Sequence, residues 1–501
     1  MSTDSSTFVR GSSLLLFGRV ISLSINFVAQ VIIVRYLTKQ AFGSYAFALT
    51  IATLASNVAT LGFHTTLARF APGFVEQKDY RRLWGSFLFM SGCILAISVA
   101  IIACVLGARG VISARYVTDP ATLGVLFILI YYIPVNALDR YFENALAVFA
   151  GPRAIFIRRH LVGPALKLSA VLAVILVSGD EQLLAWCYLG AGALGVLLYV
   201  SILGHVFRKQ GILGELRNGL TIPAGALFRF GFPVLLSDLN LVIRSALVLF
   251  LLESLHGSES VADFRAVIPL ADLNKFVSRN FTILFIPVAA RLLAQNRTTD
   301  LVALLRQAVT WIAILTFPLF LISFVMPGPV CSLVFGKVYT SSGPVLAALA
   351  LAYYVHAMMS FCAHTLKVYN KVQLLAVLEI LATILVALLA FWWIPIAGAV
   401  GAASAVAAGT LLQALATLIL LWRLTGVMPF GKETLGLWAS LVLGTLILFA
   451  IVRFSAPSIW IGLPIAAVIA LTVAAINRHR LSLDNTFPEL ARIPFIKKWL
   501  S

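Results

Sequence analysis

Four charged residues lie within an apolar stretch that is long enough to cross a membrane. The stretch is FRAVIPLADLNKFVSRNFTILFIPV, residues 264–288, and its charged members are Arg265, Asp272, Lys275 and Arg279. About 20 residues of helix span a bilayer. At 100° per residue, a strip roughly 40° wide holds Arg265, Asp272 and Arg279, and Lys275 lies about 40° to its side. A charge at the membrane centre costs at least about 3 kcal/mol, so this face must meet protein or water rather than lipid.

Two interpretations of this charged face are open. Asp272 can pair with Lys275 one turn further on, which leaves a net charge of about +2 on the face. In the first interpretation, the charges neutralise one another at a contact between helices. In the second, they line a water-accessible cationic cavity that receives an anion. We favour the second, because positive charge is left over.

Two other apolar stretches carry residues of the same kind. Arg19 and Asn26, in the first stretch of the chain, are seven residues apart and share a helix face. A later stretch, residues 229–252, contains Asp238 and Arg244. With residues 264–288 these stretches carry five positive and two negative side chains, a net charge of +3, from Arg19, Asp238, Arg244, Arg265, Asp272, Lys275 and Arg279. Such a set favours a polyanion, and the forked guanidinium of arginine suits phosphate oxygens.

A further group of charges lies in the sequence NALDRYFENA, residues 136–145. Asp139, Arg140 and Glu143 sum to −1, and Arg140 can reach Glu143 on the same helix. A bound proton or cation would neutralise this group. Equally, the residues can form a structural ion-pair cluster. Pro134, shortly before the group, can kink the helix.

Membrane-spanning helices must position these charges, because the composition excludes a soluble protein. Of the 501 residues, 61% are hydrophobic and 11% are charged, and the mean hydropathy is +1.00. This balance predicts an all-α polytopic membrane protein. The five cysteines have no metal-ligand or disulfide spacing, and the chain contains no phosphate-binding loop, His-Glu-x-x-His or Gly-x-Ser-x-Gly. We therefore expect no metal, no cofactor and no enzymatic activity.

Hydropathy predicts about 14 transmembrane helices and their orientation. Their approximate ranges are 12–34, 42–63, 85–107, 122–149, 161–178, 183–204, 229–252, 264–289, 305–326, 343–366, 372–394, 396–421, 434–452 and 459–476. Of the 37 Lys and Arg residues, 25 lie in connectors on one side, six on the other and six within spans. The positive-inside rule therefore predicts an inner (cytoplasmic) membrane protein with both termini in the cytoplasm. The basic residues cluster between apolar spans, so we expect no nucleic-acid partner.

The predicted spans divide into two six-helix lobes and an addition. We assign residues 1–204 to an N-terminal lobe with helices 1–6, 205–228 to a basic interfacial helix on the cytoplasmic side, 229–421 to a C-terminal lobe with helices 7–12, 422–476 to two further helices, and 477–501 to a cytoplasmic tail suited to an interfacial anchor. We interpret the two lobes as a parallel repeat. Tyr45 and Phe264 follow similar polar linkers 219 residues apart, and Asp79 and Asp300 occupy similar loops 221 residues apart. Parallel repeats are typical of transporters that rock two bundles around a central site.

Several motifs resemble those of a known family. They are VIIVRYLTKQAFGSYAFAL at 31–49, TLARFAPGFVEQKDYRRLW at 66–84, FIPVAARLLAQNRTTDLVALLRQ at 285–307, LVFGKVYTSSGPVLAALALAYY at 333–354 and LAFWWIPIAGAVGAASAVAAG at 389–409. In order and spacing they resemble bacterial polysaccharide transporters. These are the lipid-linked oligosaccharide (O-antigen type) flippases of the multidrug/oligosaccharidyl-lipid/polysaccharide (MOP) exporter superfamily. The resemblance covers nearly the whole chain.

The resemblance implies a V-shaped, two-lobed protein that opens alternately to each side of the membrane. It would carry a polyprenyl-diphosphate-linked oligosaccharide from the cytoplasmic to the outer leaflet, for surface lipopolysaccharide or exopolysaccharide. The family's cationic cavity maps onto Arg19, Arg244, Arg265, Lys275 and Arg279. Residues that would modulate the cavity or couple transport to H+ or Na+ are Asn26, Asp139, Arg140, Glu143, Asp238 and Asp272. A polysaccharide polymerase and chain-length proteins are expected partners.

Two other functions compete with this one. A multidrug exporter of the same superfamily is expected to have an acidic cavity for cationic drugs, whereas the charges here are mostly positive. A membrane polysaccharide polymerase needs a sizeable outer loop or an acidic catalytic pair, and the predicted outer connectors are short. The flippase therefore fits the residues best.

Overall fold

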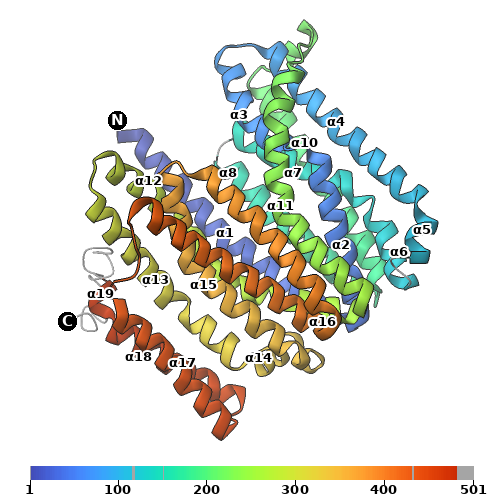
Figure 1. Cartoon of the computed structure of the whole chain (residues 1–501). Coiled ribbons are helices and arrows are strands. Elements are labelled where there is room, and N and C mark those ends of the chain that lie inside the picture. Colours follow the sequence, from blue (N-terminus) through green and yellow to red (C-terminus); the bar gives the residue numbers. More distant parts are fainter. Residues whose placement is uncertain (1, 116–118, 151, 432–433, 482–501) are drawn as a thin grey trace. The chain divides into compact units, whose positions relative to one another are not determined.

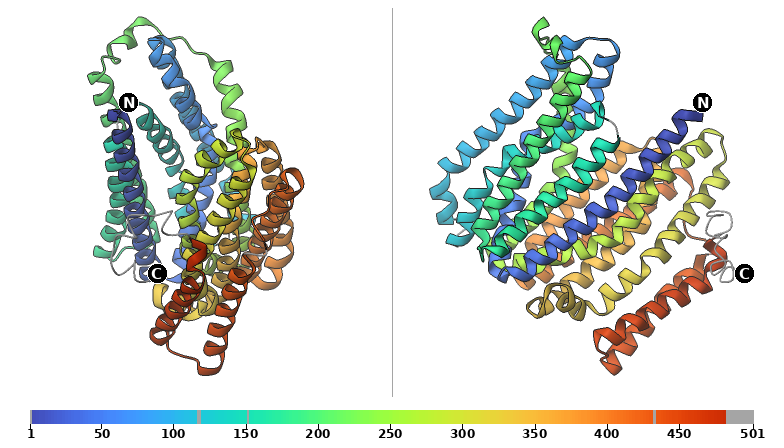
Figure 2. Two further views of the ribbon diagram at one scale, coloured as in Figure 1. Left: turned by 90° about the vertical axis from the view of Figure 1, so that its left-hand side faces the viewer. Right: turned by 180° about the vertical axis from the view of Figure 1, so that it is seen from behind.

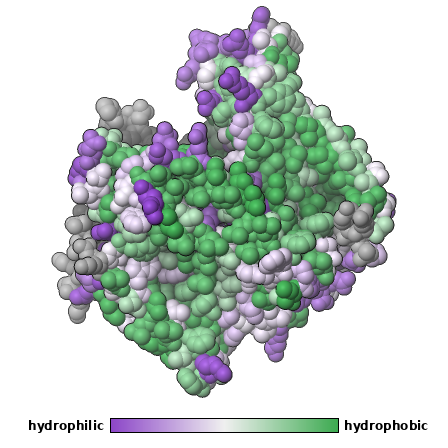
Figure 3. All heavy atoms as spheres, in the orientation of Figure 1, coloured by the Kyte–Doolittle hydropathy of each residue, from purple (hydrophilic) through white to green (hydrophobic). Residues whose placement is uncertain are grey.

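The fold is built from helices. The structure is a computed structural model that describes residues 2–115, 119–150, 152–431 and 434–481, and no strand occurs in these ranges. Figure 1 shows the arrangement of the helices. Hydrophobic side chains cover most of the face in Figure 3, as expected for a chain surrounded by lipid. The predicted all-helical membrane fold is confirmed, and the predicted tail anchor, beyond residue 481, lies outside the described residues.

Most predicted spans correspond to single helices. Eleven helical segments of the described residues are long and apolar enough to cross a membrane, or up to thirteen if two bent pairs each form one span. One of the eleven, α16 (Val372–Thr425), has 54 residues. At 1.5 Å per residue it would extend about 80 Å, more than twice the thickness of the hydrocarbon core. If α16 contains two spans, each predicted range falls on one helical segment except 122–149, which falls on two. The number of crossings stays a prediction.

Helix α16 is a hairpin of two helical halves. Gly398 breaks it with φ 52° and ψ −126°, a conformation that essentially only glycine adopts. A Cβ on Gly401 would lie 2.0 Å from the carbonyl oxygen of Trp393, and a Cβ on Gly409 would lie 2.2 Å from Cγ2 of Val386. These contacts join residues at similar distances on either side of Gly398, so the halves are antiparallel.

The chain forms two compact units, Met1–Arg265 and Ala266–Ser501. Helix α12 (Ser258–Ala294) begins in the first and continues in the second. The other elements of the first unit are α1 (Ser2–Tyr36), α2 (Lys39–Thr60), α3 (Phe63–Glu76), α4 (Tyr80–Gly107), α5 (Arg109–Arg115), α6 (Pro120–Leu129), α7 (Tyr132–Phe149), α8 (Pro152–Ile155), the π-helical segment η1 (Phe156–Val162), α9 (Gly163–Leu176), α10 (Glu181–Lys209), the 3-10 helix η2 (Gly214–Asn218) and α11 (Ala224–His256). Helix α11, predicted to open the second lobe, packs on α2 and α3 within the first unit. The six-helix lobes stay a prediction.

The second unit contains the remaining helices. They are α13 (Thr298–Val325), α14 (Pro327–Phe335), the 3-10 helix η3 (Lys337–Ser342), α15 (Gly343–Val368), α16, α17 (Leu435–Ser455), α18 (Ile459–Ile476) and α19 (Arg478–Leu481). Helices α17 and α18 pack on each other and on α13, at the edge of their unit (Figure 2). They carry many exposed apolar side chains, including Val442 and Phe449. This placement fits two helices added on the lipid side of a bundle.

The segment 205–228 does not form the single interfacial helix that we predicted. Helix α10 runs on to Lys209, a turn and η2 follow, and residues without regular structure lead to Pro223 before α11. The segment is held against the start of α4: Trp84 Nε1 donates to the carbonyl of Ile212 at 2.9 Å, and Thr221 N donates to the carbonyl of Arg81 at 3.1 Å. Aromatic packing closes this region, because the Trp84 and Phe207 rings meet at 5.2 Å. Turn residues and tertiary hydrogen bonds override the amphipathic pattern here.

Two helix breaks position the charged residues of the first unit. The predicted span 122–149 is divided into α6 and α7, bent by 41°. The break at Ile130–Tyr131 lies four residues before Pro134, because a proline cannot donate to the carbonyl four residues earlier and clashes with it. Between α2 and α3, Leu61 and Gly62 adopt left-handed backbone angles, with φ 47° and 70°.

Two loops of the predicted repeat end their helices in the same way. After α3, the N–H of Lys78 bonds to the carbonyl of Val75 and that of Asp79 to Phe74. After α12, Asn296 and Arg297 bond in the same way to Leu293 and Leu292. Lys78 and Asn296 both have left-handed φ, 54° and 57°. The same motif also follows α9, at Ser178 and Gly179, and α15, at Asn370 and Lys371, so it is a common helix ending and the repeat stays a prediction.

Candidate functional site

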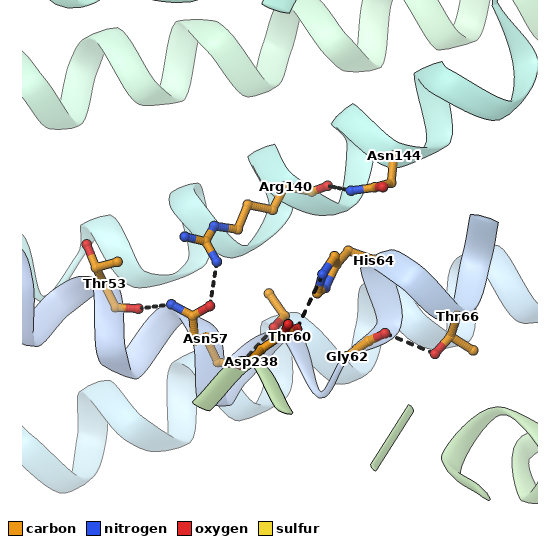
Figure 4. A network of polar contacts seen from close by, with 9 residues as sticks. All are labelled: Thr53, Asn57, Thr60, Gly62, His64, Thr66, Arg140, Asn144 and Asp238. Atoms are coloured by element: carbon orange, nitrogen blue, oxygen red, sulfur yellow. Dashed lines mark hydrogen bonds and ion pairs between the residues drawn. The ribbon is translucent and has the colours of Figure 1, made fainter. Parts of the chain in front are cut away.

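A polar network lies where α2 breaks into α3 (Figure 4). His64 Nε2 at the start of α3 is 3.4 Å from Asp238 Oδ2 on α11. Arg140 of α7 donates to the side-chain oxygen of Asn57, whose amide donates to the carbonyl of Thr53 at 2.7 Å. The break brings α11 close, since a Cβ on Gly62 would lie 2.3 Å from the carbonyl oxygen of Gly231. Asp238, a predicted ion-coupling candidate, therefore faces a histidine that the sequence pattern did not select.

The charged group on α7 is neutralised by other elements of the first unit. Arg158 Nη2 lies 2.9 Å from Asp139 Oδ1, and Arg159 Nε lies 2.8 Å from Glu143 Oε1. Arg140 bonds to α2 instead of reaching Glu143 on its own helix, because the packing of α2 on α7 supplies an acceptor. With two further arginines the group sums to +1. The structural ion-pair cluster, one of the two interpretations of these residues, is the arrangement observed.

Arg158 is the most deeply buried arginine of this cluster. Its side chain is 5% exposed, and its guanidinium carbon lies 3.9 Å from the centre of the Tyr199 ring. The predicted span 161–178 left Arg158 in the preceding connector, but Arg158 lies on the candidate span Arg153–Leu176. Hydropathy places such basic residues outside a span unless their partners are known. The sequence did contain one signal for a basic partner, because Asp139, Arg140 and Glu143 on α7 leave a net charge of −1.

The first-unit cations of the predicted cavity lie on three helices. Arg19 on α1 is partly buried and close enough to His160 of η1 for its charge to act on the imidazole. Asn26, on the same face of α1 about two turns further on, is exposed and donates to the carbonyl of Ser22 at 2.6 Å. Arg244 on α11 is partly buried. Arg265 on α12 is partly buried, and its charge reaches the hydroxyl of Tyr45 on α2.

The second unit contains the remaining predicted cavity residues. Lys275 Nζ lies 2.5 Å from Asp272 Oδ1, so the predicted pair is confirmed. The same Nζ lies 3.4 Å from the centre of the Tyr353 ring on α15, a cation–π contact that the sequence did not indicate. Arg279, one turn further along α12, is exposed.

The predicted cationic cavity would draw on both units. Arg19, Arg244 and Arg265 belong to the first, and Lys275 and Arg279 to the second. Its assembly stays a prediction, as do the roles of these residues. Within the described ranges, no three His, Cys, Asp or Glu side chains gather into a group that could hold a metal ion.

Comparison with solved structures identifies the fold. The lipid II flippase MurJ, in an inward closed conformation, matches with a TM-score of 0.70 and 13% identity over 94% of this chain and 99% of that one. An inward-facing multidrug resistance MATE family transporter of the MOP superfamily matches with a TM-score of 0.65 and 14% identity, over 81% and 95% of the two chains. A MOP superfamily transporter from Pyrococcus furiosus, reported with a binding pocket of reversed polarity, matches with a TM-score of 0.54 and 15% identity, over 83% and 95%. The fold is that of these multi-pass membrane transporters.

The family follows from the sequence model that matches the chain. The model for polysaccharide biosynthesis proteins matches residues 8–277, just over half of the chain. The protein belongs to this polysaccharide biosynthesis protein family. None of the curated protein sequences is significantly similar to it. The resemblance drawn from the motifs is confirmed at the level of this family.

Proposed function

We propose that the protein is a flippase that moves a polyprenyl-diphosphate-linked oligosaccharide from the cytoplasmic to the outer leaflet. The observation that carries the proposal is the shared fold with a lipid II flippase over nearly the full length of both chains. Membership of the polysaccharide biosynthesis protein family points to a glycan substrate. The chain's basic excess, 37 Lys and Arg against 19 Asp and Glu, favours an anionic head group.

The cationic side chains on membrane-spanning helices give the proposed mechanism its chemistry. Arg19, Arg244 and Arg265 would bind phosphate oxygens through forked guanidinium groups in the first unit. Lys275 and Arg279 would do so in the second. Alternating access would expose the diphosphate to each side in turn. The membrane potential favours outward movement of about two negative charges by roughly 4–5 kcal/mol per 100 mV.

The protein would act in the inner, cytoplasmic membrane with both termini inside. The positive-inside bias supports this orientation. The flipped product would pass to a polysaccharide polymerase and chain-length proteins for O-antigen or exopolysaccharide assembly. Coupling to H+ or Na+ would supplement the membrane potential.

A multidrug exporter is the second candidate, because the fold is also shared with MATE family transporters. The sign of the binding-site charge separates the two. A drug exporter would bind lipophilic cations and need acidic residues, whereas the spans here carry the net positive set described above. The binding pocket of the transporter from Pyrococcus furiosus has the reverse polarity, and this polarity suggested a different function for that protein.

A transport assay with matched variants tests the proposal. The protein is reconstituted into liposomes that contain a fluorescent polyprenyl-diphosphate oligosaccharide, and quenching from outside reports the lipid that has crossed. We expect Arg265→Ala and Arg279→Ala each to slow crossing at least about tenfold, the effect of losing about 1.4 kcal/mol of binding. Arg291→Ala, an exposed arginine near the end of α12, is the control. Wild-type rates in both cavity variants, or faster transport of a lipophilic cation than of the diphosphate lipid, would overturn the proposal.

A further inference from the structure

Three buried hydroxyl groups meet where the Lys39 end of α2 contacts α6 and α12. Ser44 Oγ lies 2.7 Å from Thr122 Oγ1 and 3.2 Å from Ser258 Oγ, and the last two oxygens are 3.1 Å apart. All three residues are buried. Most serines and threonines of the described helices bond to a carbonyl of their own helix, as Thr50 and Ser56 do. Ser44 also bonds to the carbonyl of Gln40 on its own helix, at 3.1 Å, but its contacts with Thr122 and Ser258 join three helices.

A carboxyl group bonds to each end of this hydroxyl cluster. Thr122 Oγ1 donates to Asp119 Oδ2 at 2.6 Å. Ser258 Oγ donates to Glu253 Oε1 at 2.7 Å. Asp119 is partly buried at the start of α6, whereas Glu253 lies in the last turns of α11. Each hydroxyl has one proton, so with these two donations only Ser44 is left to donate within the triangle. Closely spaced oxygens therefore connect the partly buried Asp119 to the buried Glu253.

Nothing in this environment neutralises an ionised Glu253. The residue is 8% exposed, and Oε2 has no hydrogen-bond partner among the described residues. None of the ion pairs found in the described ranges includes it. A buried carboxylate that meets only hydroxyl groups and no cation is costly, and such a group takes up a proton instead.

The charged groups around Glu253 do not change this conclusion. Asp119 of α6 is negative and opposes ionisation of Glu253. Lys39 of α2 is held by Asp263 of α12, with Nζ 2.7 Å from Oδ2. His256 and Glu259, on the chain between α11 and α12, are exposed, so water screens their charges.

Close backbone packing keeps water out of the cluster. A Cβ on Gly43 would lie 1.8 Å from the carbonyl oxygen of Ser258, so α2 and α12 touch through their backbones. Ser258 both closes this contact and bonds to Glu253. Separation of the two helix ends would break the hydroxyl triangle and expose the carboxyl group to water, where it ionises at neutral pH.

We propose that Glu253 is a proton-binding site that controls whether the ends of α2, α6, α11 and α12 stay together. With the proton bound, the carboxyl is neutral and the ends are closed. When the ends part, Glu253 releases its proton. Asp119, Thr122 and Ser258 form the route for exchange. When Glu253 holds the proton, it donates to Ser258, Ser258 donates to Thr122 and Thr122 donates to ionised Asp119. A shift of one proton along each of these three bonds leaves Glu253 ionised, both hydroxyls intact and the proton on Asp119, which releases it to water.

The consequence for transport rests on the proposed function. In the predicted orientation this end of α2 faces the outside, where the flipped lipid would leave. Acid outside would then hold the exit closed, and neutral pH would release it. Proton binding itself needs neither a substrate nor that orientation, so a test without substrate separates this proposal from the flippase proposal.

Hydrogen exchange measured by mass spectrometry tests the site in the intact protein. The chain is held in nanodiscs of phosphatidylethanolamine and phosphatidylglycerol, and exchange is followed in residues 39–46 and 253–263 between about pH 5 and pH 8, after correction for intrinsic rates. We expect protection in both segments to fall at least about tenfold across this range in the wild type, which corresponds to about 1.4 kcal/mol. Glu253→Gln, the neutral analogue of the protonated acid, should keep the acidic level of protection at every pH. Glu259→Gln, an exposed acid in the same stretch, should behave as the wild type does.

Three results would overturn the proposal. One is a wild type whose protection does not change with pH, and another is a Glu253→Gln variant that keeps the wild-type pH dependence. The third is protection that follows Na+, in exchange for choline, rather than pH. If Glu253→Gln does not fold, Ser258→Ala decides. Loss of its hydrogen bond to the carboxylate should move the midpoint of the transition up by about one pH unit, and an unchanged midpoint counts against the site.

Discussion

The first unit neutralises its buried acids in two different ways. On α7, Asp139 and Glu143 meet the guanidinium groups of Arg158 and Arg159. At the end of α11, Glu253 meets hydroxyl groups and, in our proposal, a proton. A guanidinium keeps its charge at every physiological pH, so the first arrangement is permanent. A proton can leave when water enters, so the second can switch. The ion pairs between α7 and η1 therefore stabilise a fixed part of the unit, whereas the ends of α2 and α12 can open and close.

Removal of the buried arginine should have the largest effect. Arg158→Ala leaves Asp139 without its partner and removes the contact with the Tyr199 ring. We expect a loss of about 2–4 kcal/mol in the free energy of unfolding. The buried guanidinium leaves a gap, but the Asp139 side chain is 34% exposed, so the loss stays below the full cost of an isolated buried charge. Denaturant titration in detergent micelles, followed by tryptophan fluorescence, measures it.

The matched control removes the acid as well. Arg158→Ala combined with Asp139→Asn leaves no isolated charge, so at least half of the lost stability should return. Glu253→Gln should remain within about 1 kcal/mol of the wild type, because it replaces a neutral group by a neutral one. Equal losses for Arg158→Ala and Glu253→Gln would remove the distinction between the two regions.

A steric change at the ends of α2 and α12 should have the second largest effect. Gly43→Ala places a methyl group where the carbonyl of Ser258 lies, so α2 and α12 must move apart. We expect a cost of about 1–3 kcal/mol despite the better helix propensity of alanine. Exchange protection of residues 253–263 should be lost at acidic as well as neutral pH. Gly92→Ala on α4, with no atom within 4 Å of the added Cβ, is the control and should be neutral or slightly stabilising. A Gly43→Ala variant that keeps full protection would show that this end is not closed by backbone contact.

The exposed half of the ion-pair cluster should contribute less. The Arg159 side chain is 55% exposed, so water solvates both Glu143 and the arginine when the pair opens. We expect Arg159→Ala to cost about 1 kcal/mol or less. Its effect should shrink further at high salt, whereas that of Arg158→Ala should not. A salt-independent loss as large as that of Arg158→Ala would mean that burial does not separate the two arginines.

Helix positions could be predicted because they depend on local properties. Runs of about 20 apolar residues have few alternatives to a membrane helix. The antiparallel halves of α16 appeared as two ranges, 372–394 and 396–421, on either side of a proline and glycines. The exact break before Pro134 also follows from local chemistry, through the carbonyl four residues earlier.

The site depends on contacts that local patterns do not contain. Hydropathy predicts Arg158 in a connector, because it contains no information about the contact with Asp139 on another helix. Ser44 and Thr122 carry no signal, since hydroxyl residues in helices usually bond to their own backbone. Asp272 with Lys275 was predictable, because both lie on one helix a turn apart.

Asp272, neutralised by Lys275, is a third acid to compare with Asp139 and Glu253. We expect removal of its partner to have the smallest effect on stability. Lys275→Met leaves Asp272 without a cation, but the Asp272 side chain is 37% exposed, so water can solvate it. The methionine stem still packs on Tyr353 through a sulfur–aromatic contact. We expect a change of about 0.5 kcal/mol or less in unfolding free energy, and Lys275→Arg, which keeps the charge, should match the wild type. Transport of the diphosphate lipid should nevertheless fall in Lys275→Met and persist in Lys275→Arg, because the proposed role of this cation is to bind substrate. A loss of stability comparable to that of Arg158→Ala would instead class Lys275 with the arginines between α7 and η1 and remove it from the proposed cavity.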